Sequence, residues 1–417
     1  MLVVDDNLIQ TTLQVALEQH LLDSEDTLAI FLDRAVIDDR LHRLREAFGE
    51  SAHHAVAIKS NPLMHVLQHL VRQGAGLEAA SFAEVCMASS AGIDNTRIVF
   101  DSPAKTVREI QQLQERFPGI RVNADSLTEL SRYPQSGSGL KIGLRVNPLI
   151  TASTVESMNV GGKKSKFGES IDNHESIVRE AVRCEDLDCL HIHVGSQYTD
   201  LEPTVLAVRR IVDLAHDINK AAKENKITTI DIGGGFPVNY HSGNPYQIKD
   251  YALALKSKCP ELFDGQFEII TEFGRYVHAN ACWALSRVEY TKPSNLIVHA
   301  GADMFVRECY NPDDWHHEMM VLDSNGEPKA GQSVPVDIAG PLCFGGDFIG
   351  RGVEIPAAKS GDWLAIKDVG ANTFSLWSRH CSRAFPKVLA TDSNLDAIAV
   401  EIVKRRESIE SIVKFWS

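Results

Sequence analysis

A lysine stands at the end of an apolar run in the stretch AVAIKSNP. The run before Lys59 predicts a buried strand that ends at this lysine. The stem of the side chain would lie against apolar residues and the amine would face a cavity. Burial lowers the pKa of an amine, so we expect Lys59 to form a Schiff base readily. The alternative is an ordinary surface lysine whose stem lies along the protein and whose amine is in water.

Three consecutive glycines, Gly233, Gly234 and Gly235, follow the strand-like run TTIDI. A backbone without side chains lets several N–H groups approach an anion such as a phosphate. No Gly-Lys-Ser/Thr follows, and the spacing is not the GxGxxG of a dinucleotide site. The glycines therefore predict either a phosphate site of another kind or only a tight turn.

A carboxylate ends another apolar run, because Glu272 follows EIIT and precedes Gly274 and Arg275. A buried carboxylate needs a cation or a hydrogen-bond donor beside it. That partner is either Arg275 or the protonated nitrogen of a heterocyclic ligand.

Two histidines alternate with apolar residues in the stretch LHIHVGSQ. His191 and His193 are therefore expected on one face of a strand. Gly195 and Ser196 follow closely. A histidine in a strand is usually a core residue with its hydrogen bonds satisfied or a metal ligand. Since no third ligand follows at a useful spacing, we predict no metal.

The elements that position these residues alternate between about residues 30 and 275, where short apolar runs are separated by longer segments of helical period. This alternation is typical of βα units around a parallel sheet. Eight strands predict a (β/α)8 TIM barrel, whose active site lies at the carboxyl ends of the strands. The predicted strands are 55–59, 77–80, 97–100, 121–124, 141–146, 189–194, 228–232 and 268–272.

Polar side chains lie in, at or just after the ends of these predicted strands, as a barrel active site requires. They are Lys59, Glu78, Asp101, Ser102, Asn123, Asp125, Arg145, His193, Asp231 and Glu272. Strand ends are commonly polar, but these residue types in this order favour a functional site.

The sequence pattern changes after Arg275 from alternating strand and helix segments to mainly strand-like segments separated by Gly, Pro, Asp and Asn. These segments are NLIVHAG, SVPVDIAG, DWLAIKDVG and AIAVEIV. They predict a β-rich domain. We assign residues 30–275 to the barrel and residues 1–29 and 276–417 to the β-rich domain.

The composition excludes several classes of function. The chain has 417 residues, and 42 basic against 56 acidic residues give a net charge of −14, which argues against nucleic-acid and anionic membrane surfaces. No apolar run is long enough to span a bilayer, and Asp5 and Asp6 stand where a secretory signal is basic. The eight scattered cysteines are typical of reduced thiols, so we expect a cytoplasmic protein.

Several motifs resemble, in family order, the fold-type III pyridoxal-phosphate decarboxylases that act on diaminopimelate, ornithine, lysine and arginine. The motifs are AVAIKSNP, GAGLEAAS, LRVNP, KFG, HIHVGSQ, DIGGGFP, EFGRYVHANACWALSRVEY and AGPLCFGGD, from about residue 50 to about residue 390. The resemblance implies a barrel with a β-rich domain, pyridoxal 5'-phosphate as the cofactor, and loss of CO2 from an amino acid.

The resemblance also implies roles. Lys59 is the lysine that holds the cofactor, His193 stacks on its ring, and Glu272 pairs with the ring nitrogen; an acid there favours decarboxylation over racemisation. Cys343 resembles a catalytic cysteine that reaches the neighbouring subunit's cofactor, which implies a homodimer with shared active sites. The other residues implied at the cofactor are Glu78, Arg145, Ser196, Gly233, Gly234, Gly235, Gly274, Arg275 and His380.

The chain departs from this family where the substrate is expected. Phe344 follows Cys343, at the position where diamino-acid decarboxylases have an Asp or Glu that binds the distal amine. A phenyl ring offsets little of the cost of burying an ammonium group. Asn372 and His380 replace two tyrosines that are usual in the family.

Other residues near the predicted substrate are basic. Arg379, His380 and Arg383 lie within one short stretch. Arg307 and Tyr310 resemble a pair that holds a distal carboxylate, with a spacing one residue shorter. We therefore expect the far end of the substrate to be anionic.

The predicted substrate is a carboxylate-rich conjugate such as citryl-diaminopropionate, an intermediate of siderophore biosynthesis. The alternatives are a carrier-tethered glutamyl group and diaminopimelate or another diamino acid. Two interpretations without catalysis are a pyridoxal-phosphate carrier and a regulator that has lost the cofactor. The β-rich domain and Cys343 argue against the carrier, and Lys59, Glu272 and the three glycines argue against the regulator.

Overall fold

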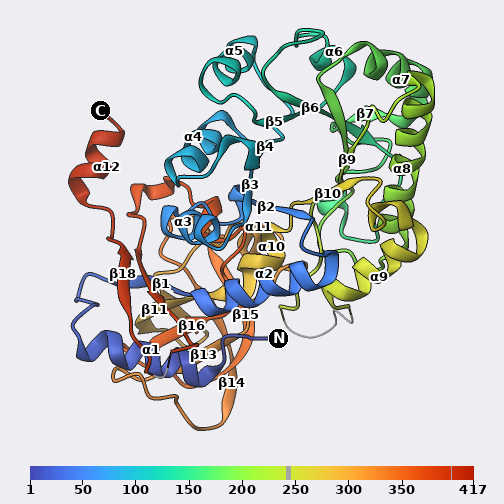
Figure 1. Ribbon diagram of the computed structural model, residues 1–417. Helices are drawn as coiled ribbons and strands as arrows, with labels where there is room; N and C mark the ends of the chain where they lie inside the picture. Colours follow the sequence, from blue (N-terminus) through green and yellow to red (C-terminus); the bar gives the residue numbers. More distant parts are fainter. Residues whose placement is uncertain (241–245, 396) are drawn as a thin grey trace. The chain divides into compact units, whose positions relative to one another are not determined.

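The computed structural model describes residues 1–240, 246–395 and 397–417, and they form two compact units (Figure 1). The barrel unit comprises Leu41–Val238 and the described residues from 246 to Tyr276. The β-rich unit comprises Met1–Arg40, residues 239–240 and the described residues from Val277 to Ser417.

The barrel unit is built on a closed ring of parallel strands. Neighbouring strands pair in the order β5-β4-β3-β2-β10-β9-β8-β6, and β5 also pairs with β6, which closes the ring. The predicted (β/α)8 barrel is confirmed. The strands are β2 (His53–Ala57), β3 (Gly76–Ala79), β4 (Ile98–Phe100), β5 (Arg121–Ala124), β6 (Lys141–Asn147), β8 (Leu187–His191), β9 (Thr229–Asp231) and β10 (Glu268–Thr271), with β7 (Glu169–Ser170) beside β6.

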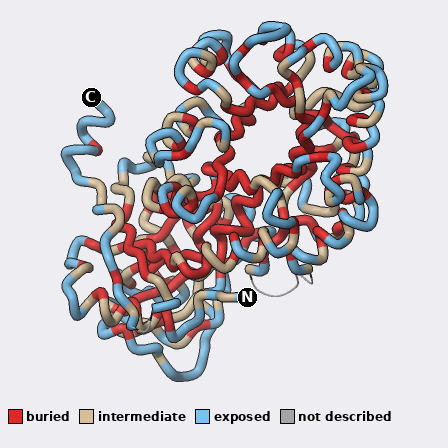
Figure 2. The backbone as a smooth tube through the Cα atoms, viewed as in Figure 1, coloured by how far each residue is buried: buried red, intermediate tan, exposed pale blue. Residues whose placement is uncertain are grey.

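Helices surround this ring, and Figure 2 shows buried strands inside a partly exposed outer layer. Helix α5 illustrates how the sequence starts a helix: the hydroxyl of Thr106 accepts from the backbone N–H of Glu109, and the Glu109 carboxylate accepts from that of Thr106. The helices are α3 (Met64–Arg72), α4 (Phe82–Ser90), α5 (Val107–Arg116), α6 (Leu127–Leu130), α7 (His174–Arg183), α8 (Glu202–Ala222) and α9 (Ile248–Lys258), with α2 (Arg34–Phe48) and α10 (Gly274–His278) at the unit boundaries.

Two predicted strands extend two or three residues past the ends of the observed ones. β2 ends at Ala57, and Lys59 lies in a 3-10 turn, Ile58–Ser60. β8 ends at His191, so His193 lies in the following loop. The apolar pattern continues past both ends because Ile58 and Ile192 remain buried, and the sequence therefore does not mark where pairing stops.

The β-rich unit contains a large mixed sheet in the order β15-β14-β12-β11-β1-β17-β18, with β16 paired to β11 and β13 paired to β16. The N-terminal strand β1 pairs antiparallel with β11 and parallel with β17. The strands are β1 (Leu28–Asp33), β11 (Cys282–Thr291), β12 (Asn295–Val298), β13 (Met319–Leu322), β14 (Ser333–Ala339), β15 (Phe348–Pro356), β16 (Trp363–Ile366), β17 (Lys387–Thr391) and β18 (Glu401–Lys404).

The N-terminal helix α1 (Asp6–Glu18) covers this sheet. Its residues Leu8, Ile9 and Leu13 pack in one buried cluster with Phe31 and Trp283, whose rings stack at 5.5 Å. The other helices of the unit are α11 (Val306–Tyr310) and α12 (Ile409–Phe415). Among the described helices of both units, none combines the length and the apolar character needed to cross a bilayer.

Candidate active site

Lys59 and Glu78 form a close ion pair at the ends of neighbouring barrel strands. Lys59 follows β2, and Glu78 lies in β3 opposite Ala57. The Lys59 Nζ lies 2.7 Å from the Glu78 Oε2. The lysine side chain is 52 % exposed and the glutamate side chain 0 %, so a small molecule can reach the amine from the side opposite its carboxylate.

The expectation that the pKa of Lys59 lies below that of an ordinary lysine is wrong. Burial does act in that direction, but the neighbouring carboxylates of Glu78, Glu272 and Asp101 outweigh it and raise the pKa. Lys59 is therefore an ammonium ion until a proton is removed. Glu78 is a suitable acceptor, because burial and the nearby Asp101 raise its pKa to about 7.

A buried acidic cluster lies beside this pair. Glu272 directly follows β10, the strand that pairs with β2. Burial and the carboxylates of Asp101, Asp231 and Glu78 raise the pKa of Glu272 well above its usual value. Burial together with Asp101 also raises the pKa of Asp231 to about 7. The cluster consequently retains protons at neutral pH that carboxyl groups in water would have released.

His191 points into the same cluster. Its Nε2 lies 3.5 Å from the Asp101 Oδ2 and 3.7 Å from the Glu272 Oε2. Burial lowers the pKa of His191 to about 4, so its ring is neutral at neutral pH. The sequence suggested a core histidine or a metal ligand but did not indicate these neighbours, because Asp101 and Glu272 follow β4 and β10, which are distant in the chain.

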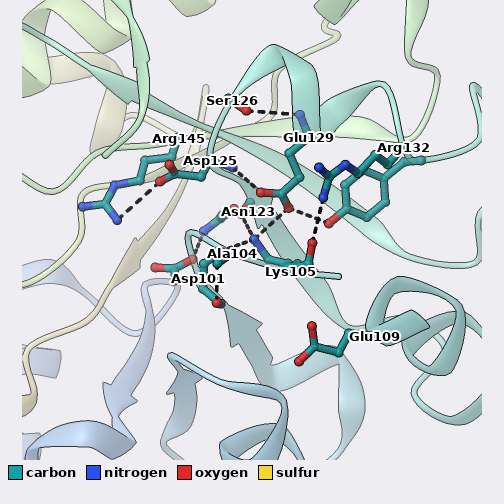
Figure 3. Close-up of polar contacts among 12 residues, drawn as sticks. Asp101, Ala104, Lys105, Glu109, Asn123, Asp125, Ser126, Glu129, Arg132 and Arg145 are labelled. Carbon is teal, nitrogen blue, oxygen red and sulfur yellow. Dashed lines mark hydrogen bonds and ion pairs between the residues drawn. The ribbon is translucent and has the colours of Figure 1, made fainter. Parts of the chain in front are cut away.

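The fully buried Lys105 is linked to Asp101 of this cluster through Asn123 (Figure 3). The ammonium of Lys105 donates to the carbonyl oxygens of Ser102 (2.6 Å) and Asn123 (2.7 Å) and to Glu129 Oε1 (2.9 Å). The Asn123 amide in turn donates to Asp101 Oδ1 at 2.7 Å. Sequence reasoning missed Lys105 and Glu129, since a lysine in a loop after a strand usually faces solvent.

Arg145 lies on the same side of the barrel as this network. Its Nη1 is 3.8 Å from the Asp125 Oδ1 (Figure 3). Its guanidinium lies over the ring of Phe167, 4.4 Å from the ring centroid. The arginine is buried, and the aromatic contact covers one face of the guanidinium.

The three glycines form a loop that no other residue type would fit. Gly233 and Gly235 have φ of +67° and +95°, and a side chain at 235 would collide with the carbonyl oxygen of Gly195. The Gly234 N–H donates to His193 Nδ1 at 3.1 Å. The proton of the His193 ring is therefore on Nε2. Burial and Arg145 lower the pKa of His193 well below its usual value, so the ring is neutral.

Two further predicted residues meet beside this loop. The Arg275 Nε donates to the Ser196 Oγ at 3.2 Å. Gly274, at the start of α10, lies against the turn that carries Lys59, where a side chain would collide with Ser60 and Ala57. The structure thus brings the predicted barrel residues into one region at the carboxyl ends of the strands.

The remaining predicted residues belong to the β-rich unit. Cys343 is exposed, and the next residue, Phe344, stacks on Tyr310 with ring centroids 5.2 Å apart. The guanidinium of Arg307 lies over the Trp315 ring at 4.6 Å. Asn372 adopts a left-handed backbone conformation, with φ of +55°, and His380 is exposed.

The arginines expected to supply positive charge are engaged by carboxylates of their own unit. Arg379 makes two hydrogen bonds of 2.6 Å to Glu407. The Arg383 Nε lies 3.4 Å from the Asp303 Oδ2, and its Nη2 donates to the carbonyl oxygen of His299 at 3.2 Å. The surplus of positive charge inferred from the sequence is therefore smaller in the folded unit.

Comparisons with known proteins give one consistent result. The family described as "Pyridoxal-dependent decarboxylase, pyridoxal binding domain" matches residues 34–279. The diaminopimelate decarboxylases of Methanothermobacter thermautotrophicus and Haemophilus influenzae are 31 % and 30 % identical over 94 % of this chain and cover 92 % and 94 % of their own lengths. The crystal structure of Helicobacter pylori diaminopimelate decarboxylase with L-lysine matches with a TM-score of 0.85 at 27 % identity, over 96 % of this chain and 99 % of that one.

Proposed function

The chain belongs to the pyridoxal-dependent decarboxylase family, and from this premise we propose that it removes the α-carboxyl group of an amino acid whose far end carries a carboxylate, with diaminopimelate as the first candidate. It is a carboxy-lyase that uses pyridoxal 5'-phosphate. One observation carries the proposal. Lys59 and Glu272 follow the paired strands β2 and β10, close enough for Glu272 to raise the pKa of the Lys59 amine.

The barrel residues fit the cofactor. The amine of Lys59 is accessible, and the Glu272 Oε1 is buried without a hydrogen-bond partner among the described residues, as expected of a group that waits for a ligand donor. The glycine loop carries no side chains, because a Cβ at any of its three positions would collide with the backbone of a neighbouring loop. When bound, pyridoxal 5'-phosphate supplies an electron sink for the pair left behind by CO2.

Lys59 and Glu78 prepare the attachment of the cofactor. The Lys59 amine must lose a proton before it can attack a carbonyl carbon, and the Glu78 carboxylate at 2.7 Å can accept it. Glu272 would hold a proton at the ring nitrogen, which its raised pKa suits. The neutral ring of His193, oriented by the Gly234 N–H, offers a flat face for stacking.

The phosphate would be held by groups that the structure places around one loop. Within the loop, the Gly233 and Gly234 N–H groups donate to Asp231 Oδ1 (3.0 Å) and His193 Nδ1 (3.1 Å), which leaves the Gly235 N–H for a phosphate. Ser196 with Arg275 adds a hydroxyl and a positive charge. Because Arg275 already bonds to Ser196, both donors are oriented before a ligand arrives.

We assign reprotonation of the α-carbon to Cys343, in the active site of a neighbouring copy of the chain. Its exposure on the β-rich unit supports this assignment, since a thiol that serves another subunit must be accessible. The enzyme would then be a homodimer with shared active sites. Sedimentation of the holoenzyme, and activity recovered by mixing inactive Lys59→Ala and Cys343→Ala chains, test this arrangement.

The described cysteines are all free, which supports a reducing compartment. We therefore place the enzyme in the cytoplasm. Detection of activity and of the protein in the soluble cytoplasmic fraction tests this assignment.

The choice of diaminopimelate follows the named relatives, which align along nearly the whole chain. A second candidate, a carboxylate-rich conjugate such as citryl-diaminopropionate, is favoured by the Tyr310–Phe344 stack, because this apolar surface replaces an acidic side chain that would pair with a distal ammonium. That substrate would place the enzyme in siderophore biosynthesis.

Measurement of CO2 release from the purified holoenzyme separates the candidates. We expect turnover of meso-diaminopimelate to exceed that of lysine and ornithine, which lack a distal carboxylate. Faster turnover of citryl-diaminopropionate would establish the second candidate. A visible absorbance band that persists in Lys59→Ala after borohydride and gel filtration would contradict the assignment of Lys59.

A further inference from the structure

We propose that Asp101, His191 and Glu272 form a buried site for a divalent transition-metal ion such as Zn²⁺ in the cofactor-free protein, and that the ion and the cofactor exclude each other. Asp101 and Glu272 directly follow β4 and β10, and His191 ends β8; together they offer two carboxylates and an imidazole. Such a mixed set is typical of protein zinc ligands.

The spacing of the three ligand atoms suits a zinc ion. The Nε2 of His191 lies 3.5 Å from the Asp101 Oδ2 and 3.7 Å from the Glu272 Oε2, and all three ligand atoms lie within 4.8 Å of one another. Bonds of about 2.0–2.1 Å in a tetrahedron place neighbouring ligand atoms roughly 3.4 Å apart. Small side-chain rotations would therefore complete the coordination.

An independent observation indicates that a ligand is missing here. His191 is 1 % exposed, and neither nitrogen of its ring has a hydrogen-bond partner among the described residues. The Oε1 of Glu272 is also buried and unpaired within the described part of the chain. Buried polar atoms of native proteins are normally paired, so an ion that binds both groups would remove this cost.

The surroundings hold one ligand in place. The Asn123 amide donates to Asp101 Oδ1 at 2.7 Å (Figure 3), which leaves Oδ2 for His191, whose Nε2 lies 3.5 Å from it. The ammonium of Lys105 fixes Asn123 through its carbonyl oxygen. Supporting hydrogen bonds of this kind orient metal-binding carboxylates and strengthen binding.

The ion and the cofactor compete because both need the carboxyl group of Glu272. This part of the inference rests on the proposed function, in which Glu272 pairs with the ring nitrogen of the cofactor. Zinc bound to the Oε2 of Glu272 would make the carboxylate less basic and so weaken the pairing of its Oε1 with that nitrogen. A protein loaded with zinc before the cofactor should therefore acquire the cofactor more slowly.

Equilibrium dialysis of the cofactor-free full chain against Zn²⁺ tests the site. The exposed thiols are removed first by Cys343→Ser and Cys381→Ser, because thiolates also bind zinc. We expect one ion per chain, and at least 10–100-fold weaker binding in both Asp101→Asn and His191→Leu, the range seen when a supporting partner is lost. His174→Leu removes a histidine that pairs with Asp217 on the surface and should leave binding unchanged.

Circular dichroism confirms that each variant is folded, and Asp101→Asn keeps the test valid should the buried His191→Leu fail to fold. Equal binding by wild type and folded Asp101→Asn, or no binding by the wild type, would overturn the proposal. Cofactor uptake is followed by absorbance with and without one equivalent of Zn²⁺, and slower uptake supports the competition. Zinc that binds at the cluster without slowing uptake would refute the competition and the pairing of Glu272 with the ring nitrogen, but not the cofactor dependence of the enzyme.

Discussion

The carboxylate of Glu78 contacts the amine of Lys59 at 2.7 Å and is inaccessible to solvent, whereas about half of the lysine side chain is exposed. The two members of this pair thus experience different environments. Solvent can hydrate the ammonium, but the carboxylate depends on its protein neighbours for stabilisation. The protonation state of Glu78 therefore depends more strongly on its protein neighbours than that of Lys59 does.

The stability of the cofactor-free protein should depend on Glu78 near neutral pH. Burial raises the pKa of Glu78 from 4.5 to about 7, so the native state holds a proton that the unfolded chain has released. This stabilisation is complete below pH 4.5 and is lost as the pH rises through about 7. Between pH 6.5 and 8, the free energy of unfolding should fall by roughly 1 kcal/mol more in the wild type than in Glu78→Gln, as measured by urea unfolding. An equal fall in both proteins would contradict the raised pKa.

The glycine loop should tolerate no side chain at position 235. Gly235→Ala combines an unfavourable φ of +95° with a collision against Gly195, and we expect weaker cofactor binding together with lower stability. Gly265 has a similar φ of +91° and open space around it. Gly265→Ala therefore measures the cost of the left-handed backbone conformation alone, about 1 kcal/mol in the free energy of unfolding. Thermal unfolding and cofactor titration compare the two variants. Similar losses in both would show that the close approach at Gly195 is unimportant.

Removal of the buried ammonium should destabilise the barrel strongly. Lys105→Met leaves the Glu129 carboxylate buried without its cation, at an expected cost of about 3–5 kcal/mol in the free energy of unfolding. Lys141, exposed at the start of β6, provides the control, because Lys141→Met should change stability by less than about 0.5 kcal/mol. The double variant Lys105→Met/Glu129→Gln should recover part of the loss. No recovery would mean that the ammonium acts mainly through the carbonyl groups of Ser102 and Asn123.

An acid at position 344 should broaden the choice of substrate. A carboxylate in place of the phenyl ring would pair with a distal ammonium, and we expect Phe344→Asp to raise kcat/KM for lysine about tenfold, the effect of a charged hydrogen bond of roughly 1.5 kcal/mol. Phe344→Leu removes the stack on Tyr310 without adding charge. If the Asp and Leu variants behave alike, Phe344 does not face the far end of the substrate.

The barrel was predictable because its strands are short apolar runs whose spacing leaves room for helices. β5 was predicted with its observed bounds, Arg121–Ala124. The ends of β2 and β8 were not, since Ile58 and Ile192 stay buried after strand pairing has stopped. Burial, which the sequence records, and pairing, which it does not, end at different residues there.

The site was predictable as a set of positions but not as a set of contacts. Asp101, Asn123 and Asp231 were recognised as polar residues near strand ends, yet their mutual hydrogen bonds depend on how the strands are ordered around the ring. The charge state of Lys59 was mispredicted for the same reason. Its amine meets carboxylates from three other strands, and their combined field outweighs burial.

The pairing of β1 has a consequence for synthesis of the chain. All six residues of Leu28–Asp33 are buried, between β11, which begins at Cys282, and β17, which begins at Lys387. At about 5–20 residues per second, roughly 12–50 s separate translation of β1 from that of β11. All eight barrel strands, which end with β10 at Thr271, are translated in that interval, while the apolar strand β1 still lacks both neighbours. A shortened gene for the barrel alone should therefore start after residue 33. A chain that kept β1 without β11 and β17 would expose an apolar strand whose backbone has no pairing partner.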